Sequence, residues 1–262
     1  MEVYAIPNYE CTLSCPHCEI KDMKCKWNKD KFISAIESLP DGAAVTLFGG
    51  EPTMFSDRLE ACWKTGKITS ISTNLLHLNY VTWQVLLDQK ISIATSWNHT
   101  RFNDILSLSR WLGNLEALAK VGRTCMILVT LTEDLIADDS WNDMIATFDS
   151  IDRTGACDRL LFESLISDDA QQEFYDRCDE WLCKIHHIWR WNFRNEIEEK
   201  VKNGWKFVCN DTWTLHPDGN MVFGCPHGKK KAICTKCFSC ERKSSCKPCA
   251  LQRCCTMPKQ LA

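Results

Sequence analysis

Length, composition and charge describe a folded protein rather than a disordered chain or a membrane protein. The 262 residues are 45% hydrophobic and 25% charged, with a net charge of −3, so a substantial core is available. No apolar run approaches the length of a membrane span, and the opening residues 1–7 lack the basic and apolar segments of a secretory signal. The 18 cysteines are therefore expected to be metal ligands in a reducing cytoplasm.

Short apolar runs alternate with amphipathic segments through most of the chain. The predicted strands are 2–6, 43–48, 68–72, 91–95, 125–131 and 159–165. The predicted helices are 28–39, 56–64, 80–89, 104–121, 141–151 and 169–189, with Ser56 as the cap of the second. This alternation predicts an α/β protein with a parallel sheet and its helices outside, and ligands bind such folds at the carboxyl ends of the strands.

Three cysteines lie close together directly after the first predicted strand. Cys11, Cys15 and Cys18 are separated by three and then two residues, which suits three thiolate ligands of one iron–sulfur cluster. Such a set leaves one iron open for catalysis. A zinc site completed by His17 or Cys25 is the alternative that the spacing allows.

A glycine pair follows the second predicted strand. Gly49-Gly50-Glu51-Pro52 allows a sharp turn and a close approach of the backbone to a ligand. Together with Cys11, Cys15 and Cys18, these residues resemble the two motifs of the radical S-adenosylmethionine (radical SAM) superfamily, Cys-x3-Cys-x2-Cys and Gly-Gly-Glu-Pro. His17 takes the usually aromatic position before the third cysteine.

The resemblance implies a fold, a cofactor pair and a reaction. It implies a partial (β/α)6 barrel in which a [4Fe-4S] cluster on the three cysteines binds SAM at its open iron. Gly49, Gly50 and Glu51 would receive the methionine amino group, with Pro52 completing the motif. One electron, from a reductant such as flavodoxin or ferredoxin, would cleave SAM to a 5′-deoxyadenosyl radical that abstracts a substrate hydrogen.

Further contacts to SAM are expected where the next two strands end. Related enzymes carry a hydroxyl near the end of the fourth strand, a position that Ser96 matches, and Asn74 after the third strand is its expected companion. Ser and Asn also serve commonly as turn and cap residues, which is the alternative for both. Glu163 and Asp218 are candidate acid–base groups.

The composition changes after residue 194, so the barrel is expected over 1–194 and a cysteine-rich domain with its connector over 195–262. Asp218-Gly219, between alternating residues, predicts a β-hairpin. The nine cysteines from 209 onward resemble, with small departures in spacing, the SPASM and twitch extensions of radical SAM enzymes, which hold auxiliary [4Fe-4S] clusters.

The resemblance implies one or two auxiliary clusters. One would use Cys209, Cys225 and Cys249, completed by Cys234. The other would use Cys237, Cys240, Cys246 and either Cys254 or Cys255. Zinc sites are the alternative for these pairs. The remaining cysteines are expected to be core or surface residues.

The sequence leaves the substrate open. SPASM-type relatives most often modify peptides or proteins, so a peptide or protein side chain is the first expectation. Residues 228–262 hold nine basic residues and one acidic residue, which keeps a nucleotide or a nucleic-acid base as the alternative, although the same cations would also balance the charge of thiolate clusters. An iron–sulfur or zinc binding protein without enzymatic activity is the third class.

Overall fold

A single mixed sheet organises the chain. The computed structural model describes residues 1–16, 18, 20, 22–98, 102, 105–136, 141–164, 177–178, 181, 205–207, 212–223 and 258–260. Within these ranges one sheet has eight strands in the order β6-β5-β4-β3-β2-β1-β8-β9. The first six are β1 (Glu2–Ala5), β2 (Ala44–Leu47), β3 (Ile68–Ser72), β4 (Ser92–Trp97), β5 (Cys125–Leu131) and β6 (Cys157–Ser164). All five pairings among them are parallel.

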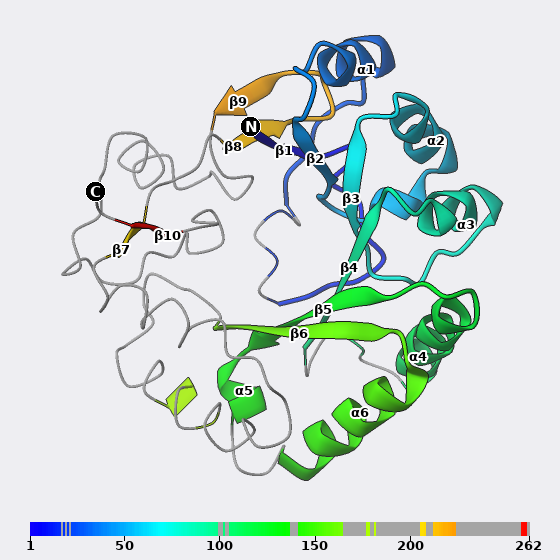
Figure 1. The fold of residues 1–262 in the computed structure, drawn as a ribbon, viewed down its shortest axis with the longest axis vertical. Helices are drawn as coiled ribbons and strands as arrows, with labels where there is room; N and C mark the ends of the chain where they lie inside the picture. Colours follow the sequence, from blue (N-terminus) through cyan, green and yellow to red (C-terminus); the bar gives the residue numbers. More distant parts are fainter. Residues whose placement is uncertain are drawn as a thin grey trace.

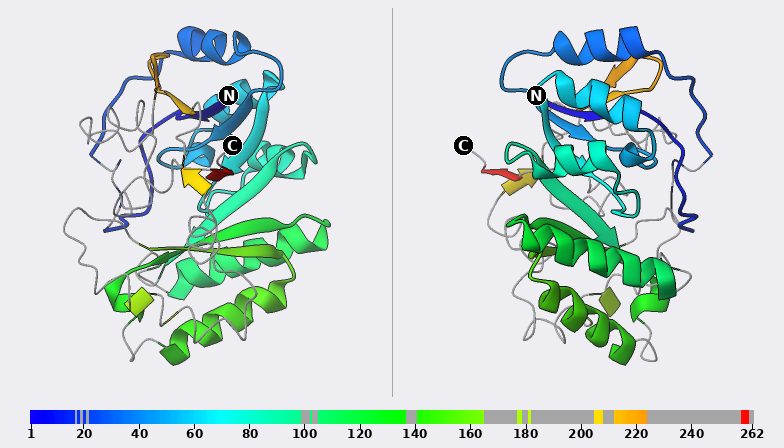
Figure 2. Two further views of the ribbon diagram at one scale, coloured as in Figure 1. Left: turned by 60° about the vertical axis from the view of Figure 1, so that its left-hand side comes forward. Right: turned by 90° about the vertical axis from the view of Figure 1, so that its right-hand side faces the viewer.

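Helices cover the outer face of this sheet, which curves as an open arc in Figure 1. They are α1 (Lys29–Glu37), α2 (Ser56–Lys64), α3 (Tyr80–Leu87), α4 (Ile105–Lys120), α5 (Glu133–Ile136) and α6 (Trp141–Thr154), and a 3-10 helix, η1 (Pro52–Met54), follows β2. The two views in Figure 2 show α1 to α4 on the same side of their strands. Strand, helix and parallel strand therefore repeat as the sequence predicts.

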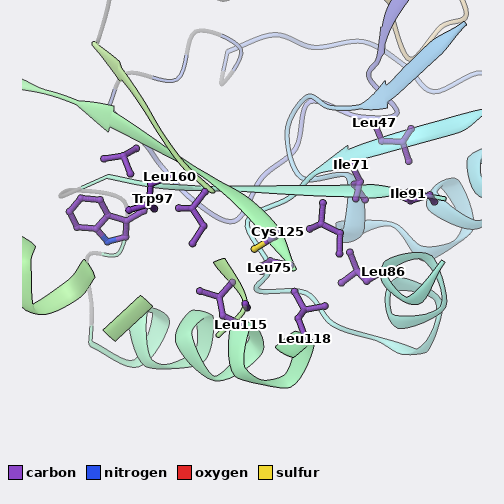
Figure 3. Packing of buried hydrophobic residues seen from close by; sticks show 14 of the residues in the cluster. Leu47, Ile71, Leu75, Leu86, Ile91, Trp97, Leu115, Leu118, Cys125 and Leu160 are labelled. Carbon is purple, nitrogen blue, oxygen red and sulfur yellow. The ribbon is translucent and has the colours of Figure 1, made fainter. Parts of the chain in front are cut away.

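The hydrophobic core lies between the sheet and these helices. Leu86 of α3 and Leu115 and Leu118 of α4 belong to one buried cluster with strand residues such as Ile71 and Trp97 (Figure 3). Each fully buried side chain of this size stabilises the fold by about 1.5–3 kcal/mol relative to exposure. The strands are thereby fixed against the helix layer.

On β3 and β4, the opposite face of the sheet carries smaller and more polar side chains. Alternation along β3 and β4 turns Ile71, Ile93 and Trp97 to the helices and Ser70 and Ser96 the other way. The hydroxyl groups of Thr46 and Ser70 lie 2.5 Å apart and are hydrogen-bonded across β2 and β3. The inner face of the arc is thus lined partly by hydroxyl groups rather than by large apolar side chains.

Two local predictions differ from the structure. Strand β4 continues to Trp97, so Ser96 lies within the strand rather than after it. Ser56 is the first residue of α2, and its N-cap is Phe55, whose side chain makes no cap hydrogen bond. Ser56 Oγ instead accepts a hydrogen bond of 2.9 Å from Asn79 Nδ2.

The predicted helix 169–189 falls outside the described residues except at 177–178 and 181, which are helical.

The predicted hairpin is confirmed and joins the same sheet. Strands β8 (Thr212–Leu215) and β9 (Met221–Phe223) pair antiparallel across the turn that holds Asp218 and Gly219. Strand β8 also pairs in parallel with β1, with Ala5 opposite Leu215. Two further strands, β7 (Trp205–Phe207) and β10 (Pro258–Gln260), form a separate antiparallel pair. The domain boundary after residue 194 stays a prediction, because residues 182–204 are not among those described.

No described helix is long and apolar enough to cross a bilayer.

Candidate functional site

The three motif cysteines lie in one loop that follows β1. Cys11 is exposed, Cys15 and Cys18 are partly exposed, and all three carry thiols rather than disulfides. The backbone N–H of Cys18 donates to the carbonyl of Cys15 at 3.1 Å, which makes a tight turn between the second and third cysteines. His17 lies outside the described residues. Across the described residues, no three His, Cys, Asp or Glu side chains form a group arranged to hold a metal ion.

The glycine motif after β2 is in direct backbone contact with the start of this loop. The N–H of Gly50 donates to Asn8 O at 3.1 Å, and the N–H of Glu51 donates to Glu10 O at 2.7 Å. A Cβ atom on Gly49, whose φ is +124°, would lie 2.8 Å from Asn8 O, and one on Gly50 would lie 2.1 Å from Glu10 O. Side chains at these two positions would therefore push the cysteine loop away from β2.

The carboxylate of Glu51 is buried and accepts four hydrogen bonds from the protein. Oε1 accepts from the backbone N–H of Thr53 at 3.0 Å and from the hydroxyls of Thr53 and Thr73, each at 2.7 Å. Oε2 accepts from the backbone N–H of Asn74 at 2.6 Å. The carboxylate thus joins the loop after β2 to the loop after β3. The resemblance to the Gly-Gly-Glu-Pro motif predicts a contact of Glu51 with SAM. It does not predict that the Glu51 carboxylate connects these two loops.

Asn74 brings the third strand to the cysteine loop. Its side chain is 2% exposed, and Nδ2 lies 3.8 Å from Cys11 Sγ. A little further along the same loop, His77 Nε2 and Thr12 Oγ1 are hydrogen-bonded at 2.8 Å. The loops after β1, β2 and β3 therefore meet at one edge of the sheet, as the strand order predicts.

Ser96 lies on the next strand of the same sheet, with a half-buried side chain on the inner face. Its neighbour Thr95 faces the helices, where its hydroxyl accepts a hydrogen bond of 3.1 Å from Trp111 Nε1. Ser96 is therefore the hydroxyl near the carboxyl end of β4 that is turned away from the core. Of Glu163 the structure describes the backbone, within β6.

The hairpin turn between β8 and β9 contacts Tyr9, at the start of the cysteine loop. The hydroxyl of Tyr9 and Nδ1 of His216 are hydrogen-bonded, and Asp218 and Cys25 lie close to this pair. Burial is the main cause that raises the pKa of Tyr9, and burial also lowers the pKa of His216. Both shifts favour the uncharged side chains, and their hydrogen bond ties the turn after β8 to the residue that stands two positions before Cys11.

The remaining cysteines divide into described and undescribed groups. Cys62, Cys125 and Cys178 are buried, as expected of core residues. Burial raises the pKa of Cys62 to about 12, so this thiol stays protonated and unreactive. All nine cysteines from Cys209 to Cys255 lie outside the described residues, so the auxiliary-cluster ligands stay predictions.

Sequence reasoning missed Asn8, Tyr9, Thr73 and His77, which hold these loops together. Asn8 Nδ2 donates to Glu51 O at 3.0 Å, and Asn8 Oδ1 is a buried acceptor with no hydrogen-bond partner in the described structure. Their only sequence signal is position, because each lies close along the chain to a motif residue or to a candidate site residue.

The residues present fit a cluster and SAM by their chemistry. Cys11, Cys15 and Cys18 are accessible thiols in one loop, and thiolates are the soft ligands that iron–sulfur clusters use. The side chain of Asn8, whose Nδ2 donates to Glu51 O, also carries the unpaired acceptor Oδ1, which suits a ligand ammonium group.

No protein-family model and no curated protein matches the sequence. Among solved structures, the chain is similar to hexahistidine-tagged anSMEcpe with bound AdoMet, with a TM-score of 0.66 and 14% identity over 93% of this chain and 79% of that one. It is also similar to Streptococcus suis SuiB bound to S-adenosylmethionine, with a TM-score of 0.49 and 18% identity over 70% of this chain and 44% of SuiB.

The likeness to anSMEcpe establishes the fold class. The chain shares the fold of anSMEcpe, a partial β/α barrel with a parallel sheet and its helices outside. The motifs in the first 52 residues lie at the carboxyl edge of this sheet.

Proposed function

We propose that the protein is a radical SAM enzyme. The observation that carries this proposal is the meeting of the three-cysteine loop with the loop Gly49–Pro52 at the carboxyl edge of the barrel, through the hydrogen bonds of Gly50 and Glu51. A similarly folded protein, anSMEcpe, binds AdoMet.

Each motif has a separate task in this proposal. Cys11, Cys15 and Cys18 hold a [4Fe-4S] cluster, and the Gly49–Gly50 backbone with Asn8 Oδ1 receives the amino group of SAM. Ser96 contacts SAM from β4. A cluster held by these cysteines would supply the electron for reductive cleavage of SAM, the chemistry that starts hydrogen abstraction from a substrate. The buried carboxylate of Glu51 keeps the loops that surround these groups in register.

The C-terminal cysteines are proposed to hold one or two auxiliary [4Fe-4S] clusters. The support is their spacing, which resembles that of SPASM and twitch extensions. Residues 212–223 of the same region reach the barrel through β8 and the Tyr9–His216 hydrogen bond, which brings this part of the chain beside the cysteine loop.

We propose a peptide or protein side chain as the substrate, on the strength of that same resemblance. A flavodoxin or ferredoxin would supply the electrons. A nucleotide or nucleic-acid base is the second candidate, and the observation that favours it is the excess of basic residues in 228–262. Replacing Lys229, Lys230 and Lys231 by Gln would weaken substrate binding in a salt-dependent manner only if the substrate is a polyanion.

The test is anaerobic reconstitution followed by iron, sulfide and 5′-deoxyadenosine analysis with dithionite and SAM. The triple variant in which Cys11, Cys15 and Cys18 are replaced by Ala should lose about four irons per chain and all 5′-deoxyadenosine formation. Cys25→Ala removes a half-buried thiol outside the motif and is the matched control, which should keep both. Equal iron content in the triple variant and the wild type would refute the assignment, and zinc in place of iron would favour the non-enzymatic alternative.

A further inference from the structure

The side-chain amide of Asn74 has a defined orientation. Its Oδ1 accepts a hydrogen bond of 2.9 Å from the backbone N–H of Leu76. Because only the oxygen end of the amide can accept this bond, the nitrogen end must point the other way. That end lies 3.8 Å from Cys11 Sγ, a distance at which sulfur, with its larger radius, still accepts a hydrogen bond.

The backbone around Asn74 is fixed by several contacts. Its N–H donates to the buried Glu51 carboxylate at 2.6 Å. The next residue, Leu75, has a φ of +57°, the one positive φ of a non-glycine residue among those described. This conformation is costly for a leucine, so it persists where surrounding contacts impose it.

Those contacts are present on both sides of Leu75. Its N–H donates to the hydroxyl of Thr73 at 3.1 Å, its carbonyl accepts from Asn114 Nδ2 at 2.5 Å, and its side chain is fully buried. The loop is therefore held in a strained form that directs the Asn74 amide toward the cysteine loop.

We propose that Asn74 donates a hydrogen bond to the Cys11 thiolate of the loaded cluster and thereby raises the cluster's reduction potential. This inference rests on the proposed function, and the expected contact of Asn74 with SAM stays a separate prediction. Asn74 is a positioning residue that acts through the Cys11 sulfur. Glu51 acts in turn by holding the backbone of Asn74 in place.

The physical reason is the change of charge on reduction. A reduced cluster carries one more negative charge, part of which lies on the cysteine sulfurs. An N–H group aimed at such a sulfur stabilises the reduced form more than the oxidised form, so removal of the donor lowers the potential. Hydrogen bonds from the surroundings of a metal ligand tune the metal in this way.

Two substitutions isolate the donor. Asn74→Asp and Asn74→Ser both keep an oxygen that accepts from the N–H of Leu76, and both lose the Nδ2 donor. The serine variant is uncharged, so a change that both variants share does not come from added charge. The serine hydroxyl takes the place of Cγ, one bond short of Nδ2, so its proton is no substitute for the donor at Cys11 Sγ. Thr12→Val is the matched control, because it removes the hydrogen bond to His77 on the same cysteine loop without touching Cys11 Sγ.

The measurement is an EPR-monitored redox titration of the reconstituted full-length protein, with circular dichroism to verify folding. The relevant cluster is the one whose EPR signal changes when SAM is added. Loss of one hydrogen bond to a charged sulfur should lower the equilibrium constant for its one-electron reduction about tenfold, which corresponds to about 59 mV. Thr12→Val should keep the wild-type potential.

The outcomes separate the inference from the proposed function. Without a SAM-sensitive cluster signal in the wild type, the proposed function fails and the inference fails with it. If that signal is present and Asn74→Ser keeps the wild-type potential, the inference alone is wrong. If the variants do not load a cluster, pulsed EPR of the wild type with 15N in its asparagine side chains decides: a nitrogen coupling to the SAM-sensitive cluster supports the inference, and its absence overturns it.

Discussion

Replacement of Glu51 by glutamine tests the connecting role of its carboxylate. Each carboxylate oxygen accepts a backbone N–H, that of Thr53 on Oε1 and that of Asn74 on Oε2. A glutamine amide has one oxygen and one NH2 group. Whichever way the amide is turned, its NH2 group faces one of these two backbone N–H groups, and that buried donor loses its acceptor.

The expected cost follows from this mismatch. A buried polar group left without a partner costs about 1–3 kcal/mol, so Glu51→Gln should lower the free energy of unfolding by about 2 kcal/mol. For a chain of this size the melting temperature should fall by about 4–8 °C. Urea unfolding of the apoprotein, followed by circular dichroism, measures the free energy without any contribution from a cluster.

Glu60→Gln is the matched control for this substitution. Glu60 forms an exposed ion pair of 2.7 Å with Lys64 one helical turn away, and such pairs contribute about 0.3–0.5 kcal/mol. A Glu51→Gln protein as stable as the wild type would refute the argument, because it would mean that the four hydrogen bonds do not hold the loops together.

Three further predictions concern the frame around the site. Gly219→Ala places a Cβ 2.4 Å from the Cβ of Lys31 on α1, at a φ of +84°. It should lower the free energy of unfolding by roughly 1–2 kcal/mol and speed hydrogen exchange in 212–223, whereas Gly113→Ala, which has open space around it, should not destabilise the fold. A hydrogen bond from Trp63 Nε1 holds the pKa of Asp88 below its usual value, so this carboxylate stabilises the fold above the ordinary aspartate pKa and loses that effect as the pH falls. Asp88→Asn should therefore melt below the wild type at pH 7, and the difference should shrink as the pH falls below the ordinary aspartate pKa. Arg123→Lys should lower the free energy of unfolding in urea by about 2–3 kcal/mol, because the buried guanidinium donates to three acceptors at 2.5–3.0 Å that one ammonium group does not reach together. Unchanged stability would contradict the role given to these three hydrogen bonds.

The sequence predicts those parts of the fold that depend on local pattern. Apolar runs mark β2, β3 and β5 to within a residue or so, because strands buried by helices need continuous apolar side chains. Asp218-Gly219 marks the hairpin, because a tight turn needs a residue that tolerates positive φ, and Gly219 has a φ of +84°.

The parts that were missed depend on contacts between distant segments. The pairing of β8 with β1 joins residues about 210 positions apart, with Ala5 opposite Leu215, and no local pattern specifies such a partner. The carboxylate of Glu51 is equally hidden, because its partners Thr73 and Asn74 belong to a different strand end. From the sequence, both Glu51 and Asn74 are expected to contact SAM, which stays a prediction, and the hydrogen bond between these two residues was not anticipated.

The most direct test of the account is the EPR spectrum of the reduced, reconstituted protein with and without SAM. The account predicts a [4Fe-4S] signal that shifts when SAM binds, and that is absent from the variant in which Cys11, Cys15 and Cys18 are replaced by Ala. A spectrum that SAM leaves unchanged, or one that is the same in the triple variant, would contradict the claim that this loop holds the cluster on which SAM binds.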